Sequence, residues 1–391
     1  MVLVTGGQWW NRVAGARRPM GSPSVIFLDE RRWDSFNQLA SQLRLAGVRT
    51  VRLTTERGMR SQATSLLVFD RHVVLSDGDD DATVRTVLAE EDVLDIQFVE
   101  TLGHLVRRGI DLLANDVASE VVQRLVVSDK LRMSHAFTAA GVRTPPVAGV
   151  AGATPEDIAD RFGLPVVVKP RIGSGQHVTI ARDLATLRAA MGDREVGPDG
   201  LYAEQHVEGC KFNFAASVSN AGSEQELAYL VVRWKQPVGQ ATEVETVDDD
   251  QLVAIGRAAI EAAGCTGLIN MDIIRDAQGR DWLVDFNARA FGGAANFLSA
   301  GIDVSEGYLR AIGRRSAPPT SRVPEPNVRV AIFPESLREL VDSGSVGGAV
   351  IAFLRASLPY LRWLGLRYWL SVALRTPDAL ITSAKARLRS A

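Results

Sequence analysis

Cysteine is scarce in this sequence: Cys210 and Cys265 are the only two in 391 residues. Because they fit no metal-binding or disulfide spacing, they favour a reducing compartment. Long apolar runs are also missing, since none approaches the ~20 residues that a helix needs to span a bilayer. Residues 1–23 lack the apolar core and small-residue cleavage site of a secretory signal. We therefore expect a cytoplasmic protein.

Neither sign of charge is in excess. The chain has 44 Lys and Arg against 46 Asp and Glu, which gives a net charge of −2 and a pI of about 6.3. Binding to nucleic acid through a strongly basic domain is therefore not expected. A hydrophobic content of 46% and a charged content of 23% are ordinary for a globular protein. The length is too great for one simple core and predicts two or three domains.

The first third of the chain alternates strand and helix patterns. Ser24–Leu28 and Val48–Leu53 are predicted strands, and Trp33–Leu45 between them has helical periodicity that ends at Gly47. Further short apolar runs follow at Ser65–Phe69, His72–Leu75 and Val93–Phe98. This alternation predicts a parallel α/β layer to about residue 120. No GxGxxG follows the first strand, so a dinucleotide site is poorly supported.

The middle of the chain predicts a second α/β region. A helix is expected over Ser128–Ala140 with Ser128 as its N-cap, and another over Asp248–Ala263 that ends at Gly264. Strands are expected at Leu164–Lys169, Tyr202–Val207, Phe212–Val218 and Ala228–Trp234. A Pro-rich linker at 318–326 precedes a largely helical tail. We therefore expect three regions: 1–125, 126–315 and 316–391.

A hairpin is expected where Leu268–Ile274 and Trp282–Asn287 flank a tight turn. If Asp276 pairs with Asp281, antiparallel register places Asp272 opposite Asp285 and Asn270 opposite Asn287. Side chains alternate along a strand, so Asp285 and Asn287 share one face of the sheet.

Two aspartates facing each other across strands repel, and a divalent cation between them would remove the repulsion. Asp272, Asp285 and Asn287 all offer oxygen, which suits Mg²⁺ held together with substrate phosphates. The plain alternative is that one aspartate caps the turn and the other is solvated.

Basic and glycine-rich residues lie upstream of the hairpin. Lys169 ends an apolar strand and would be costly to bury without an anionic partner. Gly173 and Gly175, on either side of Ser174, let the backbone approach a ligand and present N–H groups to phosphate. A hairpin turn is the plain alternative for these glycines, and a solvated surface lysine is the alternative for Lys130.

The motifs, taken in order, resemble the ATP-grasp superfamily, which includes D-alanine–D-alanine ligase, biotin carboxylase and carbamoyl-phosphate synthase. The matching segments are SDK at 128–130, LPVVVKP at 164–170, GSG at 173–175, YAEQHVEG at 202–209, and INMDII…LVDFNARAFGG at 269–293. The resemblance covers roughly residues 24–315. It implies an N-terminal parallel α/β pre-ATP-grasp domain and a two-lobed ATP-grasp domain, here with a helical C-terminal extension.

The resemblance also implies roles for individual residues. Lys130 and Lys169 would hold the α- and β-phosphates of ATP, and residues 173–177 would close over the triphosphate. Glu204 would take the adenine amino group, with further nucleotide contacts from Gln205, His206, Val207 and Lys211. Two Mg²⁺ ions, or Mn²⁺, would lie on Asp272, Asp285 and Asn287. Arg289 would face the γ-phosphate. Arg289 and Lys169 are the expected catalytic residues.

Two positions depart from the family pattern. Asp285-x-Asn287 stands where Glu-x-Asn is usual. Lys211 stands where an acid that binds the ribose hydroxyls is expected, and Glu208 or Asn213 could take over that contact.

The implied activity is a carboxylate–amine ligase that forms an acyl phosphate from ATP and a small amino-acid-like substrate. The alternatives are a phosphotransferase on the same fold and a nucleotide-binding protein whose chemistry has decayed. Substrate contacts are expected among Glu100, Thr101, Arg289, Gly292, Gly293 and Asn296. A homodimer is a family-level expectation only.

The C-terminal segment from residue 350 onward interleaves arginines with aromatic residues. It predicts either a helical cap that packs on the body or on a dimer partner, or an amphipathic surface that docks on a membrane or an acidic partner. Pro359 and Pro377 would interrupt a single long helix.

Overall fold

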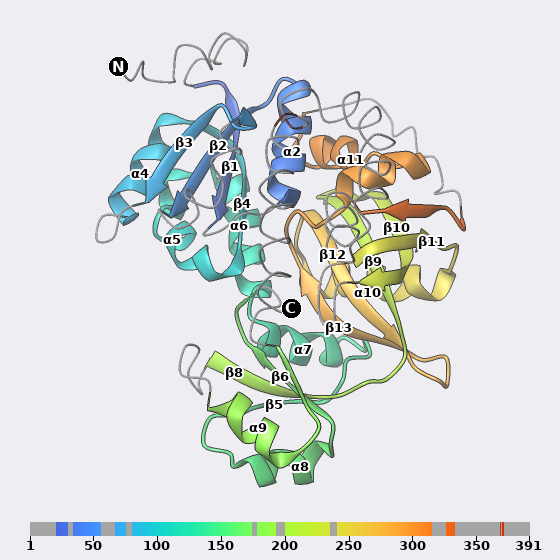
Figure 1. The fold of residues 1–391 in the computed structure, drawn as a ribbon. Coiled ribbons are helices and arrows are strands. Elements are labelled where there is room, and N and C mark those ends of the chain that lie inside the picture. The colour runs from blue at the N-terminus through green and yellow to red at the C-terminus, as the bar shows by residue number, and fades with distance from the viewer. Residues whose placement is uncertain are drawn as a thin grey trace, which may run out of the picture.

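The computed structural model describes residues 21–29, 34–55, 67–75, 80–173, 178–192, 200–234, 241–314 and 326–332, together with 368 and 370. These residues form three sheets with helices packed against them (Figure 1). The predicted α/β class is confirmed, whereas the predicted boundaries at residues 125 and 315 stay predictions.

The N-terminal sheet is parallel, with strand order β3-β2-β1-β4. Its strands are β1 (Pro23–Asp29), β2 (Arg49–Thr55), β3 (Arg71–Leu75) and β4 (Asp92–Phe98), and helices α2 (Asp34–Leu45) and α4 (Asp80–Glu90) belong to the same layer. The strands β2 and β3 are added on one side of β1 and β4 on the other, so the strand order reverses between β1 and β4. In open parallel sheets such a switch point commonly forms a crevice at the carboxyl ends of the strands. The predicted parallel layer is thus confirmed. The expected run Ser65–Phe69 is not a strand in its described part, Leu67–Phe69.

Short helices connect this sheet to the rest of the molecule: η2 (Glu100–Leu102), α5 (Gly103–Arg108), η3 (Ile110–Leu112), α6 (Asn115–Val127) and α7 (Lys130–Ala139). The prediction that Ser128 caps the last helix is wrong. The Asp129 carboxylate accepts the Arg132 backbone N–H and is the N-cap, while Ser128 ends α6 and donates its hydroxyl to the Arg124 carbonyl. The change places Lys130 in the first turn of α7.

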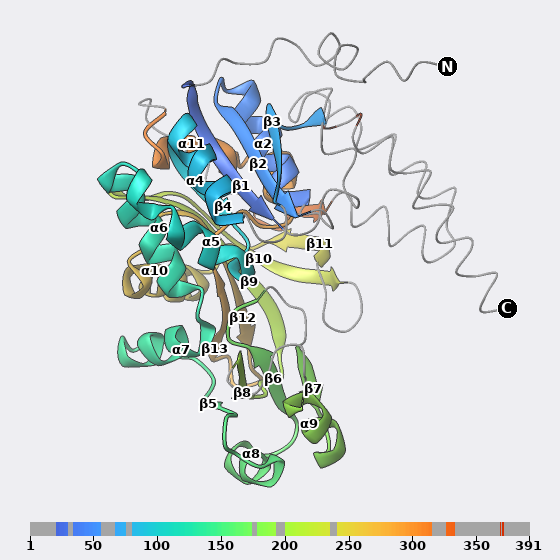
Figure 2. The same ribbon diagram turned by 90° about the vertical axis from the view of Figure 1, so that its left-hand side faces the viewer.

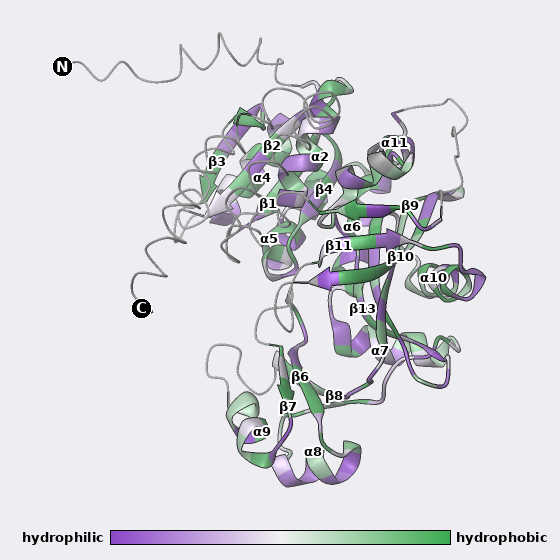
Figure 3. Ribbon diagram, turned by 45° about the vertical axis from the view of Figure 1, so that its right-hand side comes forward, coloured by the Kyte–Doolittle hydropathy of each residue, from purple (hydrophilic) through white to green (hydrophobic). Residues whose placement is uncertain are grey.

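The small sheet is antiparallel, with order β5-β8-β6-β7. It comprises β5 (Val147–Gly149), β6 (Val166–Pro170), β7 (Thr179–Ala181) and β8 (Leu201–Gln205), covered on one face by α8 (Pro155–Phe162) and α9 (Leu184–Met191). Val166 and Val168 pack under these helices, so the alternate residues Val167 and Lys169 point to the other face. Figure 3 shows β6 as hydrophobic and much of α8 as hydrophilic.

The large sheet is antiparallel with order β13-β12-β9-β10-β11-β14. Its strands are β9 (Cys210–Ser219), β10 (Gly222–Trp234), β11 (Ala241–Thr246), β12 (Gly267–Arg275), β13 (Asp281–Asn287) and β14 (Arg329–Ala331). Helices α7 and α10 (Asp250–Ala263) cover one face with a core that includes Phe137, Phe214, Leu252, Met271 and Phe286. Gly264 ends α10 in the left-handed conformation, as the sequence predicts.

The β12–β13 hairpin has the expected register in the half that is farther from the turn. Asp272 lies opposite Asp285 and Asn270 opposite Asn287. The expected pair Asp276–Asp281 is wrong, because the register shifts after Asp272 and Arg275 pairs with Asp281 instead. The Asp276 carboxylate accepts two backbone N–H groups of the turn and the Trp282 indole, so it holds the turn together.

The N-terminal and large sheets meet through η5 (Ala294–Ala300) and α11 (Val304–Ala311), and α11 packs against α2 (Figure 2). Of the C-terminal region predicted to be helical, the structure describes only residues 368 and 370. Tyr368 is fully buried, and its hydroxyl accepts a 3.0 Å hydrogen bond from Gln38 Nε2 on α2. Among the described residues, no helix combines the length and hydropathy needed to cross a membrane.

Candidate active site

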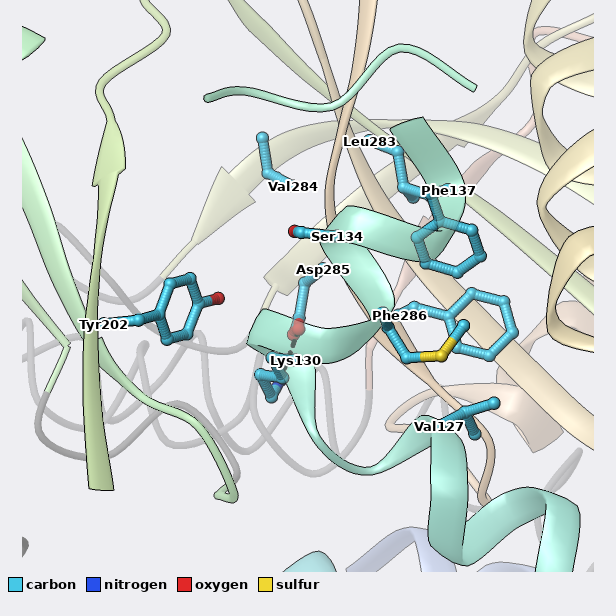
Figure 4. A pocket seen from close by; sticks show the side chains of 10 residues that line it. Val127, Lys130, Ser134, Phe137, Tyr202, Leu283, Val284, Asp285 and Phe286 are labelled. Atoms are coloured by element: carbon cyan, nitrogen blue, oxygen red, sulfur yellow. Dashed lines mark hydrogen bonds and ion pairs between the residues drawn. The ribbon is translucent and has the colours of Figure 1, made fainter. Parts of the chain in front are cut away.

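The predicted site residues converge between the small sheet and one face of the large sheet. Lys130 comes from the start of α7, Lys169 from β6, Glu204 from β8, and Asp272 and Asp285 from the β12–β13 hairpin. Figure 4 shows Lys130 and Asp285 joined beside Tyr202 of β8. The pocket drawn there is lined by Val127, Lys130, Met133, Ser134, Phe137, Tyr202, Leu283, Val284, Asp285 and Phe286.

A polar row crosses the large sheet at this point. In register, Asp285 on β13 lies beside Asp272 on β12, which lies beside Asn213 on β9, which lies beside Tyr229 on β10. The intervening residues, such as Phe286, Met271 and Phe214, point into the opposite, apolar core. Strand alternation therefore gives this sheet one face for packing and one for polar contacts.

The two lysines connect the lobes. Lys169 Nζ lies 2.7 Å from Glu204 Oε1 and donates to the Val284 carbonyl at 3.0 Å, so it joins the small sheet to β13. Lys130 Nζ pairs with Asp285, and the Lys130 backbone N–H donates to the Arg171 carbonyl at 2.8 Å. Both ammonium groups thus lie on the polar face, where the sequence predicts phosphate contacts.

The acids of the site differ in their electrostatic environments. Burial disfavours ionisation of Asp285, but the charges of Lys130 and Lys169 outweigh burial and hold its pKa below the usual value. Burial raises the pKa of Glu204 although Lys169 opposes the shift. The second oxygen, Glu204 Oε2, is buried and has no hydrogen-bond partner among the described residues. A buried free acceptor beside a lysine suits a ligand that donates a hydrogen bond.

Arg289 lies at the end of this arrangement and contacts the N-terminal part of the chain. Its Nε is 2.7 Å from Glu100 Oε1, and its Nη2 donates to Asn287 Oδ1 at 3.2 Å. Arg289 and Glu100 are each only 8% exposed. Asn287 in turn donates to Asp285 Oδ2 at 3.0 Å. A continuous polar chain therefore runs from the N-terminal sheet to the Asp285–Lys130 pair.

The pairing of Glu100 with Arg289 is a contact at the candidate site that sequence reasoning missed. Both residues appear among the expected substrate contacts, but nothing in the local pattern joins positions 189 residues apart. The available signal was the place of Glu100 directly after a parallel strand, at the sheet edge where ligands usually bind.

The segment linking the two sheets holds the residues expected to contact the nucleotide base. The Gln205 backbone N–H is already bonded to the Pro146 carbonyl at 3.0 Å, whereas His206 and Val207 are half-buried. Burial, together with the nearby Arg182 charge, lowers the pKa of His206. A Cβ on Gly209 would lie 2.0 Å from the Arg275 carbonyl oxygen, so only glycine lets this crossing pass so close to β12.

Lys211 is ion-paired with an aspartate of the hairpin. Its Nζ lies 2.7 Å from Asp272 Oδ2. Burial alone would lower the pKa of Lys211, but the Asp272 carboxylate outweighs burial and raises it. Of the two residues considered as ribose contacts in its place, Asn213 is hydrogen-bonded to Asp272 and Glu208 is exposed.

For some of the residues predicted to bind nucleotide or substrate, the structure gives no evidence of that role. Ser174 and Gly175 fall outside the described residues, and Gly173 is the last described residue before them. Gly293 has a φ of 88°, and a Cβ there would lie 2.7 Å from the Ile332 side chain, so packing alone explains this glycine.

The donor set fits magnesium. Within the described ranges, no group of three or more His, Cys, Asp or Glu side chains is arranged to enclose a metal. Asp272, Asp285 and Asn287 instead offer a few hard oxygens, which here accept hydrogen bonds or ion pairs from neighbouring side chains. Mg²⁺ keeps several waters and commonly combines one or two carboxylates with substrate phosphates, so this partial set suits it.

Comparison with known proteins agrees with this geometry. A family model described as an ATP-grasp domain matches residues 127–293. D-alanine–D-alanine ligase of Chromohalobacter salexigens is 28% identical over 184 residues, which cover 43% of this chain and 57% of that ligase. The match therefore spans little more than half of the curated relative.

Two solved structures share the fold at low identity. Biotin carboxylase from Campylobacter jejuni, in complex with β,γ-ATP, superposes with a TM-score of 0.57 at 14% identity, covering 80% of this chain and 74% of that one. L-amino acid ligase from Bacillus licheniformis gives a TM-score of 0.57 at 17% identity, covering 75% of each chain. The two sheets, the lysines and the hairpin acids all fall within or beside residues 127–293, the segment that matches the ATP-grasp family model.

Proposed function

We propose that this protein is an ATP- and Mg²⁺-dependent carboxylate–amine ligase acting on a small amino-acid-like substrate. The observation that carries the proposal is the convergence of Lys130, Lys169, Asp272 and Asp285 on one polar face inside an ATP-grasp domain. The relatives named D-alanine–D-alanine ligase favour amide-bond formation over phosphoryl transfer to a hydroxyl.

The reaction has two steps. A substrate carboxylate oxygen attacks the γ-phosphorus of ATP, the bond to the β–γ bridging oxygen breaks, and ADP leaves. The resulting acyl phosphate is attacked at its carbonyl carbon by an amine, which loses a proton as phosphate departs with the bonding electrons. Such chemistry needs positioning and charge neutralisation more than a nucleophilic side chain.

The lysines and acids divide this work. Lys130 and Lys169 lie where they can turn from their carboxylate partners to phosphate oxygens, which replaces one anion by another at little electrostatic cost. Asp285 and Asn287, with Asp272 opposite, offer oxygens to Mg²⁺. The ion would supply neutralisation of the developing phosphate charge.

Glu204 and the linking segment would hold the base. The free oxygen of Glu204 can accept a hydrogen bond from the adenine amino group. Peptide groups at Gln205 and Val207 and the half-buried His206 lie next along the chain and would complete this contact.

Arg289 would face the transferred phosphoryl group. Its guanidinium is held by Glu100 and by Asn287, so it is already oriented beside the Asp285 carboxylate. The substrate itself would lie at the carboxyl edge of the N-terminal sheet, next to Glu100, because Glu100 follows β4 and is paired with Arg289.

The test is release of ADP from Mg·ATP, screened against pools of small carboxylic acids and amines. Release that needs both a carboxylate and an amine, and that is lost in Asp285→Ala, is the expected result. Release with one hydroxyl acceptor alone would identify a phosphotransferase. Nucleotide binding without turnover across all pools would favour a protein that has kept the site and lost the chemistry.

A further inference from the structure

Lys211 is ion-paired with Asp272, one of the two hairpin aspartates. It lies on β9 opposite Ile274, two residues before Asn213, which lies opposite Asp272. Lys211 Nζ is 2.7 Å from Asp272 Oδ2, and Asn213 Nδ2 donates to Asp272 Oδ1. Both carboxylate oxygens of Asp272 therefore have donors from the adjacent strand.

Asp285 has a different kind of partner. Its cation, Lys130, comes from a helix outside the sheet, and its amide partner, Asn287, lies two residues further along the same strand. Asn287 and Asp285 share a face, so their side chains can approach one ion together. Lys130 reaches Asp285 from a helix outside the sheet, whereas Lys211 and Asn213, the two donors to Asp272, both lie on the strand that pairs with β12.

Charge counting points the same way. The polar face carries three carboxylates, Asp272, Asp285 and Glu204, and three ammonium groups, Lys130, Lys169 and Lys211. A divalent cation placed on Asp272 would be in contact with the Lys211 ammonium, and like charges at contact distance repel strongly where water is partly excluded. Asp285 becomes available for an ion once Lys130 contacts phosphate.

We propose that the Lys211 ammonium takes the place of a second metal ion. The site then holds a single divalent cation, on Asp285 and Asn287, while Lys211 neutralises Asp272 and the adjoining phosphate oxygens. This inference rests on the proposed function, since it assumes that a nucleotide triphosphate binds on this face. In this arrangement Asp272 does not bind the metal ion, and its role is to position Lys211.

The direct test is to count bound Mn²⁺ by electron paramagnetic resonance on the full-length protein saturated with a non-hydrolysable ATP analogue. One Mn²⁺ per chain is expected for the unmodified protein. Two per chain would overturn the inference but leave the proposed function standing. Failure of the protein to bind the analogue at all, measured separately by calorimetry, would contradict the proposed function itself.

Substitutions sharpen the count. Lys211→Met frees Asp272 and is expected to admit a second Mn²⁺, whereas the charge-conserving Lys211→Arg should keep one. Asp272→Asn should also retain one ion, and Asp285→Asn should lose it. A count that stays at one in Lys211→Met, or falls to zero in Asp272→Asn, would overturn the inference. Circular dichroism melts of each variant establish that the folded protein is being counted.

Discussion

Two clusters of charged side chains in this molecule are built differently. The first joins the N-terminal and large sheets, where Asp95 accepts hydrogen bonds from Arg124, Gln97 and Tyr308 and is 2% exposed. The second is the polar face around Asp285, where side chains are partly exposed and the acid partners of Lys130 and Lys169 come from other elements.

The difference lies in the carboxylate oxygens. Both oxygens of Asp95 are bonded to protein donors from β4, α6 and α11. Glu204 and Glu100, beside the polar face, each keep one buried oxygen without a partner among the described residues. Asp272 and Asp285 are fully bonded like Asp95, so the spare oxygens of Glu204 and Glu100 are what distinguish the surroundings of the polar face from the Asp95 cluster. A buried acceptor without a donor can receive a ligand, whereas a saturated one stabilises the fold.

The largest expected effect on activity comes from Asp285→Ala. This substitution removes the carboxylate that we propose as a Mg²⁺ ligand, and we expect ADP release to fall by about 10²–10³-fold. The urea midpoint should change less than it does in Asp95→Ala, because Lys130 can reach solvent. Steady-state kinetics and urea unfolding of the same preparation provide both readouts.

The largest expected effect on stability comes from Asp95→Ala. Arg124 is 2% exposed and would lose its carboxylate partner, and an uncompensated buried charge costs about 3–5 kcal/mol. Chemical denaturation measures the loss. The exposed pair Arg85–Asp111 supplies the control, since Asp111→Ala should change the stability far less than Asp95→Ala. Equal losses for the two variants would contradict the comparison.

Glu100→Gln should lower activity by a smaller factor, about 10-fold to 100-fold, through misplacement of Arg289. A positioning role predicts a fall in kcat with little change in the KM for ATP. Glu100→Asp keeps the charge but has a shorter side chain, so its activity should lie between that of the unmodified protein and that of Glu100→Gln. A change confined to the KM for ATP would instead place Glu100 in the nucleotide contact.

Gly209→Ala should destabilise the crossing between the two sheets by about 1–3 kcal/mol, because the new methyl group would overlap the Arg275 carbonyl. Gly222→Ala is a useful comparison. A Cβ there would meet nothing within 4 Å, but the φ of 122° is one that alanine rarely adopts. Thermal melts of both variants separate overlap from backbone strain.

The smallest expected effect is a pH dependence of stability. The pKa of Asp285 is lower in the folded chain than in the unfolded chain, so its pairing with Lys130 stabilises the fold above the usual carboxylate pKa of about 4 and is lost as the pH falls below it. The difference in urea midpoint between the unmodified protein and Asp285→Asn should therefore be constant near pH 7 and shrink below pH 4. A difference that grows on acidification would contradict the pairing.

Much of this fold follows from local pattern. The predicted facing of Asp272 and Asp285 is confirmed, although the Asp276–Asp281 pair from which it is counted does not form. The register shift between Asp272 and Ile273 compensates for that error by one residue. The prediction fails nearer the turn, where Asp276 is taken up by hydrogen bonds within the turn and the register shifts. The N-cap prediction fails for a related reason, since Ser128 and Asp129 are both good caps and the sequence does not rank them.

Contacts between distant segments could not be predicted in this way. The Glu100–Arg289 pair depends on how the N-terminal sheet sits against the hairpin, and the Lys211–Asp272 pair depends on the order β13-β12-β9, in which β9 and β12 are not consecutive. Both pairs change the interpretation of residues that the sequence already identifies as functional. Tertiary contacts therefore refine the roles of these residues more than their identity.

The measurement that tests the central claim most directly is oxygen transfer from a ¹⁸O-labelled carboxylate substrate, once the ADP-release screen has identified it. An acyl-phosphate ligase transfers one carboxylate oxygen to the phosphate it releases, so mass spectrometry should find one ¹⁸O in the phosphate for each amide bond formed, and none with Asp285→Ala. Unlabelled phosphate accompanying product formation would contradict the mechanism, and with it the assignment of this polar face to ligation.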